Sequence, residues 1–173
     1  MPDAPGRSLT FLLGGARSGK STHAEKLATA LPAPWTYIAT AQAYDDEMAE
    51  RIALHRSRRG EGWMTIDAPL GLAAALRAVP DARPVLVDCL TLWLSNHMLA
   101  DHDLDTLSSE LDDVLAAPRG PWFVVSNEVG LGIVPDNPLG RRFRDAQGRL
   151  NQRIAAAATQ VFFMVAGIPM QVK

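Results

Sequence analysis

Several features that mark special classes of protein are scarce in this sequence. It has a single cysteine, Cys89, which excludes a disulfide framework or a cysteine-ligated zinc site within one chain. The 17 basic and 19 acidic residues give a net charge of only −2, so no overall positive field attracts nucleic acid or an anionic membrane. No apolar run approaches the roughly 20 residues that span a bilayer, and residues 1–8 lack a secretory signal pattern. These absences favour a cytoplasmic protein.

What is present is an ordinary globular composition arranged in alternating elements. The 173 residues, 47% of them hydrophobic, predict a single domain over 1–173. Short apolar runs predict strands at 9–13, 35–39, 63–66, 84–88, 122–126 and 161–165, with an edge strand at 170–172. Helical spacing predicts helices at 19–31, 45–59, 70–79, 90–99, 104–117 and 139–158. Such alternation predicts an α/β fold, a mainly parallel sheet with helices on both faces.

A phosphate-binding loop stands between the first strand and the first helix. The pattern G-x-x-x-x-G-K-[ST] is met by Gly14, Gly15, Ala16, Arg17, Ser18, Gly19, Lys20 and Ser21. Its glycines let backbone N–H groups surround phosphate, Lys20 reaches the β- and γ-phosphates, and Ser21 ligates Mg²⁺. A glycine turn with a surface lysine is the alternative, but the strand before and the helix after favour a P-loop NTPase-like protein that binds ATP or GTP.

An acid at the end of a neighbouring strand is expected to support the magnesium ion. Asp88 follows the apolar run 85–87 and fits this role, although it also suits a helix N-cap before Leu90. Asp67 follows a shorter apolar run. It fits a nucleotide contact or a helix cap equally well.

Other motifs narrow the class of P-loop protein. The N-K-x-D motif of switch GTPases is absent, and the D-x-x-G match at 145–148 lies inside a helical pattern. A nucleic-acid motor would be longer and more basic. A small-molecule kinase or nucleotidyltransferase is therefore favoured. A kinase without a covalent step and a non-catalytic nucleotide-binding module are the rival hypotheses.

The predicted helix 45–59 carries a histidine among arginines. Met48, Ile52, His55 and Arg59 fall on one helical stripe. A neutral imidazole is a good nucleophile towards phosphorus, and neighbouring cations stabilise an incoming phosphate. A structural histidine at a helix end, beside a solvated basic face, fits the same residues, so this pattern leaves both roles open.

A second stretch follows the predicted strand 122–126, where open α/β sheets place ligands. It runs through Asn127 and Glu128 to Pro135 and continues to Arg141 and Arg144. These arginines, one helical turn apart, suit phosphate neutralisation as well as a charged surface. The sequence alone does not separate the two.

Taken in order, these segments resemble the bifunctional adenosylcobinamide kinase / adenosylcobinamide-phosphate guanylyltransferase family. The resemblance extends from Gly14 to Lys173. Beyond the phosphate loop it rests on Tyr-Ile-Ala-Thr at 37–40, Asp-Glu-Met…Arg-Ile…His at 46–55, Asn-Glu-Val-Gly-x-Gly-Ile-Val-Pro at 127–135, Phe-Arg-Asp at 143–145 and Gly-x-x-Asn-Gln at 148–152. The histidine segment and the Asn-Glu-Val-Gly segment are the more specific ones.

The resemblance implies function and site residues. It implies phosphorylation of adenosylcobinamide with ATP or GTP, then GMP transfer from GTP to the product through a GMP–histidine intermediate at His55, with Mg²⁺ as cofactor. Some relatives have a second histidine where this chain has Leu54, so His55 is the one candidate here. Family members form trimers with the histidine near a subunit boundary, which implies a homo-oligomer. Besides the loop, the implied nucleotide-contacting residues are Ala39, Thr40, Ala41, Arg56, Ser57, Arg58, Arg59, Asp67 and Asp88.

Overall fold

The backbone forms a seven-stranded sheet in a computed structural model that describes residues 6–173, apart from the side chains of Arg51, His55 and Arg58. The strand order is β3-β2-β4-β5-β1-β6-β7, parallel throughout except that β7 runs antiparallel to β6. The strands are β1 (Ser8–Gly14), β2 (Trp35–Ala39), β3 (Trp63–Asp67), β4 (Val85–Asp88), β5 (Pro121–Asn127), β6 (Gln160–Val165) and β7 (Ile168–Gln171). The predicted mainly parallel sheet is confirmed.

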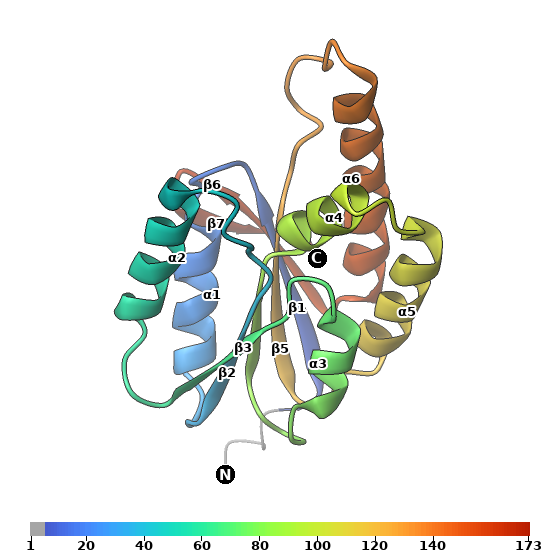
Figure 1. Ribbon diagram of the computed structural model, residues 1–173. Helices are drawn as coiled ribbons and strands as arrows, with labels where there is room; N and C mark the ends of the chain where they lie inside the picture. The colour runs from blue at the N-terminus through green and yellow to red at the C-terminus, as the bar shows by residue number, and fades with distance from the viewer. Residues whose placement is uncertain (1–5) are drawn as a thin grey trace.

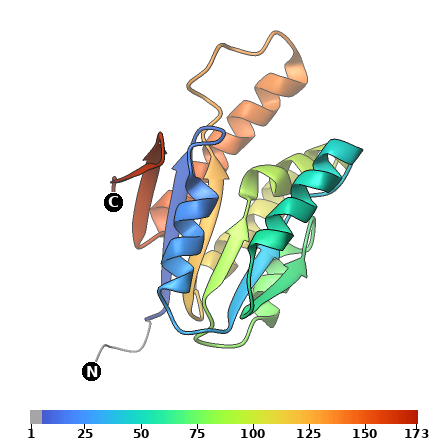
Figure 2. The ribbon, with the colours of Figure 1, turned by 90° about the vertical axis from the view of Figure 1, so that its left-hand side faces the viewer.

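The helices cover the two faces of the sheet unequally (Figure 1). Helix α1 packs on one face, and α3 to α6 pack on the other, while α2 stands at the margin of the molecule in Figures 1 and 2. The helices are α1 (Lys20–Thr29), α2 (Asp46–Arg58), α3 (Leu72–Ala78), α4 (Leu90–Leu99), α5 (Leu104–Ala116) and α6 (Pro138–Ala157). None of those helices is long and apolar enough to cross a membrane, as far as residues 6–173 show.

The core is divided between the two faces by the alternation of the strands. Leu9 and Phe11 of β1 join the cluster under α3 to α6, whereas Leu12 joins the cluster under α1. Strand β5 alternates in the same way, with Val124 in the first cluster and Val125 in the second. Because successive side chains point to opposite faces, central parallel strands are apolar at almost every position.

The register brings the carboxyl ends of four strands, β1, β2, β4 and β5, to one edge of the sheet. Gly14, the last residue of β1, is level with Asn127 of β5 and Met164 of β6. Asp88, the last residue of β4, is level with Ala39 of β2. The carboxyl ends of the central strands therefore meet at the edge where open α/β sheets bind ligands.

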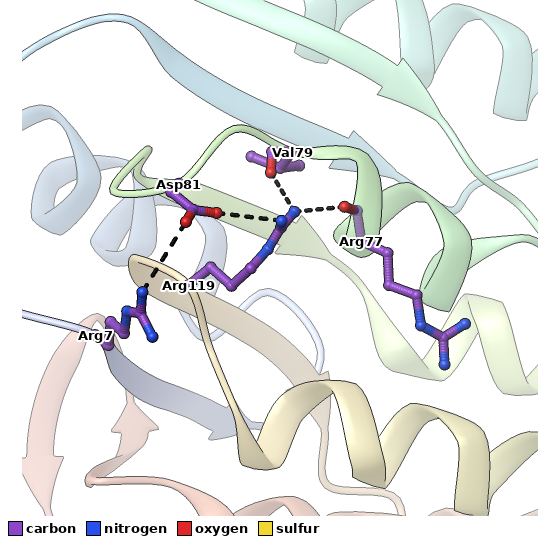
Figure 3. A network of polar contacts seen from close by, with 5 residues as sticks. All are labelled: Arg7, Arg77, Val79, Asp81 and Arg119. Atoms are coloured by element: carbon purple, nitrogen blue, oxygen red, sulfur yellow. Dashed lines mark hydrogen bonds and ion pairs between the residues drawn. The ribbon is translucent and has the colours of Figure 1, made fainter.

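A polar network fixes the opposite end of the sheet (Figure 3). The Arg119 guanidinium donates to the carbonyl oxygens of Arg77 and Val79, at the end of α3. It also forms an ion pair with Asp81 at 3.1 Å, and Asp81 lies 4.0 Å from Arg7. The last carbonyl groups of a helix lack partners within it, so Arg119 satisfies them from the segment that leads into β5.

Candidate functional site

The loop between β1 and α1 is shaped by glycines that accept no side chain. A Cβ on Gly14 would lie 2.7 Å from Ser18 Oγ and 2.8 Å from the carbonyl oxygen of Met164. Gly19 precedes α1 with a φ of 94°, and no side chain caps the first turn of that helix. Gly167, in the turn between β6 and β7, donates its N–H to the Ser18 carbonyl at 2.9 Å. The loop is thus held in shape while the helix N–H groups stay available to an anion.

Lys20 opens α1 and is buried, with a relative exposure of 7%. Its ammonium donates to the Gly15 carbonyl at 2.5 Å and lies 3.4 Å from Ser18 Oγ. Burial lowers the pKa of Lys20, and the nearby Cys89 and Asp88 partly oppose that effect. The ammonium therefore lies across the loop, and within residues 6–173 its hydrogen-bond partners are neutral oxygens, which a phosphate oxygen can replace.

A cavity of about 500 Å³ opens beside this loop. It collects side chains from the phosphate loop, the ends of β2, β4 and β5, and one side of α2. Its lining consists of Ala16, Arg17, Ser18, Gly19, Lys20, Ser21, Thr22, Tyr37, Ala39, Ala41, Met48, Ile52, Arg56, Arg59, Asp88, Cys89, Leu92, Val125 and Asn127. A hollow of this size, apolar over much of its wall and lined by cations from both the loop and the end of α2, suits a nucleotide.

Asp88 lies in this cavity and is not a helix cap. Helix α4 begins after Cys89, with no side-chain cap, so the capping alternative for Asp88 is wrong. Instead the Asp88 carboxylate accepts a hydrogen bond from the Tyr37 hydroxyl at 2.8 Å. Burial, and then the neighbouring Asp88, raise the pKa of Tyr37, which keeps its hydroxyl a donor. The Ser21 hydroxyl and the Asp88 carboxylate supply hard oxygen donors to one cavity, which is the chemistry that Mg²⁺ prefers.

The carboxyl end of α2 supplies cations to the opposite side of the cavity. The Arg59 guanidinium carbon lies 3.6 Å from the centre of the Tyr37 ring, and Arg59 Nη1 is buried without a hydrogen-bond partner among the described residues. Arg56 donates to both carboxylate oxygens of Asp67, at 2.5 and 2.6 Å. Helix α3 begins after Gly71 with no side-chain cap, so Asp67 is not its cap. The side chains of His55 and Arg58 lie outside the described residues.

Some residues implied by the resemblance do not line the cavity: Gly14, Gly15, Thr40, Ser57 and Asp67. The Thr40 hydroxyl is fully buried, where it donates to the Cys89 carbonyl at 2.7 Å and accepts from the Cys89 N–H at 2.8 Å. The Ser57 hydroxyl donates to the Leu54 carbonyl at 2.9 Å. Thr40 therefore fixes the turn after Asp88, and Ser57 stabilises the helix end.

Sequence reasoning did not assign a site role to Tyr37, Met48, Ile52 and Leu92, although all of them line the cavity. Tyr37 belongs to the Tyr-Ile-Ala-Thr segment, which was the available signal. Met48 and Ile52 lie on the predicted stripe of α2. That stripe identified a common helix face without showing that the face borders a cavity.

A buried polar network holds Asn127 at the edge of the cavity. Ser126 donates to Asn151 Oδ1 at 2.8 Å, and Asn151 donates to the Asn127 carbonyl at 3.0 Å. Gln147 donates to Ser126 Oγ and to Asn151 Oδ1, each at 2.9 Å, and the Thr91 hydroxyl accepts the Asn127 N–H at 2.8 Å. This network explains why an asparagine occurs in the Gly-x-x-Asn-Gln segment of α6.

The rest of the Asn-Glu-Val-Gly segment leaves the cavity. Residues 128–137 reach beyond the body of the molecule at the top of Figure 1, with Leu131 and Ile133 exposed. Arg141 donates to the Pro135 carbonyl at 2.8 Å, and Arg144 lies 3.6 Å from Asp145. Neither arginine lines the cavity, so within this chain they do not meet a phosphate held by the loop.

Solved structures of low sequence identity share this fold. The flagellar accessory protein FlaH from Methanocaldococcus jannaschii aligns with a TM-score of 0.55 at 14% identity, over 98% of this chain and 79% of that one. An ATPase of a bacterial type III secretion system aligns with a TM-score of 0.53 at 13% identity, over 90% of this chain and 50% of that one. At such identities the likeness shows the fold alone, which is P-loop NTPase-like.

Relatives of higher identity cover nearly the whole chain. The bifunctional adenosylcobalamin biosynthesis protein CobP of Pseudomonas aeruginosa is 51% identical over 166 residues, 94% of this chain and 96% of that protein. The bifunctional adenosylcobalamin biosynthesis protein CobU of Salmonella typhimurium is 41% identical over 182 residues, 95% of this chain and 99% of that protein. The family described as cobinamide kinase / cobinamide phosphate guanyltransferase matches residues 10–172. Because these matches extend over nearly the whole chain, the chain belongs to that family.

Proposed function

We propose that this cavity serves two successive transfers of phosphorus groups to a corrinoid. Membership of the family makes the chain a cobalamin-biosynthesis enzyme with kinase and guanylyltransferase activities. The first transfer moves the γ-phosphate of ATP or GTP to the hydroxyl of adenosylcobinamide. The second moves GMP from GTP to that phosphate and gives adenosyl-GDP-cobinamide and pyrophosphate. The observation that carries the proposal is one cavity lined jointly by the phosphate loop, Asp88 and two arginines at the carboxyl end of α2, Arg56 and Arg59.

In both transfers the loop residues would hold the polyphosphate. Lys20 would contact the β- and γ-phosphates, while N–H groups of residues 15–21 would surround them. Ser21 and Asp88 would hold Mg²⁺. The ion, when bound, neutralises charge on the phosphate oxygens as it develops. In the kinase step the substrate hydroxyl would attack the γ-phosphorus directly, and the bond to the β-phosphate oxygen would break.

His55 is the proposed acceptor of GMP. The side chains at positions 52, 56 and 59 line the cavity. Position 55 lies between them, about one helical turn or less from each, which supports this role for His55. One imidazole nitrogen would attack the α-phosphorus, and the bond to pyrophosphate would break. An oxygen of adenosylcobinamide phosphate would then attack that phosphorus, and the phosphorus–nitrogen bond would break, which regenerates the histidine.

The remaining contacts are proposals that rest on the family resemblance. Ala39 and Ala41 line the cavity, and Thr40 between them would contribute its backbone, since its side chain is engaged with Cys89. Ser57, Arg58 and Asp67 would contact the nucleotide from the end of α2 and β3. A homotrimer is also proposed, and sedimentation equilibrium of the purified protein tests it.

Labelling the protein with GTP that carries radioactive phosphorus at the α-position tests the covalent step. We expect label that is labile to acid and stable to alkali, and His55→Ala should abolish it. Leu54→Ala is the matched control, because Leu54 is the neighbouring, 52% exposed residue of α2 and should keep the label. Kinase activity without any label in the wild-type protein would refute the GMP–histidine step.

A further inference from the structure

The Tyr37 ring contacts both the acid of β4 and the arginine end of α2. Its hydroxyl donates to Asp88 at 2.8 Å, and its face lies 3.6 Å from the Arg59 guanidinium carbon. We infer that Tyr37 is a positioning residue that sets the metal-binding acid and the phosphate-binding arginine relative to each other. The inference rests on the proposed nucleotide role of the cavity and assigns Tyr37 no part in bond making.

The strand order places the ring where it reaches both partners. Strand β2 is paired with β4, Tyr37 is level with Leu86, and Ala39 is level with Asp88. Residues level with one another in paired strands project from the same face, so the ring and the carboxylate share the side that α1 covers. Tyr37 is 4% exposed, and the Trp63 ring meets it edge-on at a centroid distance of 6.1 Å. The ring is therefore fixed by packing before any ligand arrives.

The hydroxyl of Tyr37 determines how Asp88 presents its carboxylate. It holds the Oδ2 atom, and the described residues make no other hydrogen bond or ion pair with the Asp88 side chain. The carboxylate is thus fixed by one oxygen, and its Oδ1 is left for a cation. Carboxylates that bind metals are commonly oriented by such an outer hydrogen bond, and removal of the outer partner weakens metal binding.

The face of Tyr37 supports the cation at the other side of the cavity. Arg59 follows the last residue of α2, and its Nη1 is buried with no hydrogen-bond partner among the described residues. The electron-rich ring face stabilises a guanidinium without consuming its N–H donors. Arg59 is therefore held close to the cavity while its Nη1 remains available to an anion, which the proposed function identifies as nucleotide phosphate.

Two substitutions at one position separate these contacts. Tyr37→Phe removes the hydroxyl and keeps the ring, whereas Tyr37→Leu removes both. Binding of Mn²⁺, a spectroscopic substitute for Mg²⁺, would be measured by electron paramagnetic resonance with guanosine α,β-methylenetriphosphate, which cannot release pyrophosphate. Binding of the same nucleotide would also be measured in EDTA. Tyr44→Phe is the matched control, because Tyr44 is the other tyrosine and does not line the cavity.

We expect Tyr37→Phe to weaken Mn²⁺ binding about tenfold and to leave metal-free nucleotide binding unchanged. Tyr37→Leu should also weaken metal-free nucleotide binding, by about fivefold, because Arg59 loses its support. Mn²⁺ affinity of Tyr37→Phe within twofold of wild type would overturn the role of the hydroxyl. If Tyr37→Leu does not fold, Tyr37→Phe still tests the effect of the hydroxyl on Mn²⁺ binding, because this substitution preserves the shape of the core.

This outcome is independent of the covalent step. No bond breaks in the binding measurement. Absence of label on His55 would therefore refute the proposed guanylyl intermediate, whereas the Mn²⁺ and nucleotide affinities of the Tyr37 variants would still test the positioning role. Conversely, labelling of His55 together with unchanged Mn²⁺ affinity in Tyr37→Phe would refute the positioning role alone.

Discussion

The two walls of the cavity are held in place by different means. The loop wall consists of residues 16–22 with Asp88, Val125 and Asn127, and the helix wall consists of the α2 side chains Met48 and Ile52 with Arg56 and Arg59. In the loop wall, Lys20 is buried, and Asn127 is held by the buried network of α4, β5 and α6. None of the described side chains of α2 is buried or belongs to a core cluster.

Polar interactions at the two ends of α2 hold the helix wall. The Asp45 carboxylate caps α2 by accepting the Met48 N–H at 2.8 Å, Arg56 pairs with Asp67, and Arg59 lies on the Tyr37 ring. Regions with few buried contacts open locally at a lower free-energy cost than the core. The phosphate-binding groups are therefore fixed by the sheet itself, whereas the arginines and the proposed histidine depend on contacts at the ends of α2.

The largest expected effect belongs to the loop wall. Lys20→Ala removes the cation that spans the loop, and we expect kcat of the kinase reaction to fall by about 100-fold or more. Steady-state assays with adenosylcobinamide and GTP measure this. Lys26→Ala is the control, because Lys26 is an exposed lysine of the same helix. Comparable losses in both variants would contradict a specific role for Lys20.

The buried network offers the next largest effect, on stability. Asn151→Ala removes the acceptor of the Ser126 hydroxyl and the donor to the buried Asn127 carbonyl, and we expect the free energy of unfolding to fall by about 1–3 kcal/mol. Urea denaturation measures the change. The neighbouring Gln152→Ala serves as control, because Gln152 is exposed on the same helix. An Asn151 variant as stable as the control would show that this wall is not anchored by the network.

The smallest effect is expected at the helix wall. Asp67→Asn weakens the ion pair between Asp67 and Arg56. The Arg56 and Asp67 side chains are 48% and 62% exposed, so water and salt screen the contribution of this ion pair to stability. We expect a loss of less than about 1 kcal/mol in the free energy of unfolding, diminishing as salt rises. Glu110→Gln breaks the similarly exposed pair with Arg77 at 2.6 Å and gives the reference value. A larger loss at Asp67 would remove the contrast between the two walls.

Contiguous features of the site were predictable from the sequence, and contacts across strands were not. The phosphate loop is readable because its glycines, Lys20 and Ser21 lie within one short segment between a strand and a helix. The contact of Tyr37 with Asp88 depends on β2 pairing with β4, although α2, β3 and α3 separate these strands in the chain. The network around Asn151 likewise joins three elements that are distant in sequence.

Thr40 shows a different reason for incomplete prediction. The resemblance implied a run of contacts at 39–41, but Ala39 and Ala41 line the cavity while the Thr40 side chain is buried against Cys89. Side chains alternate in direction along extended backbone, so adjacent residues after a strand do not share one surface. A resemblance that implies contacts for a whole segment therefore does not show which residues contribute their backbone and which their side chains.

The phosphate loop touches the far end of the chain through the turn between β6 and β7. A Cβ on Gly19 would lie 3.1 Å from the Cα of Gly167, whose N–H bonds to Ser18. The shape of the loop is therefore not encoded in its own eight residues alone. If residues 14–21 were transplanted between another strand and helix, their sequence would be unchanged, but the loop would lose its contact with the β6–β7 turn.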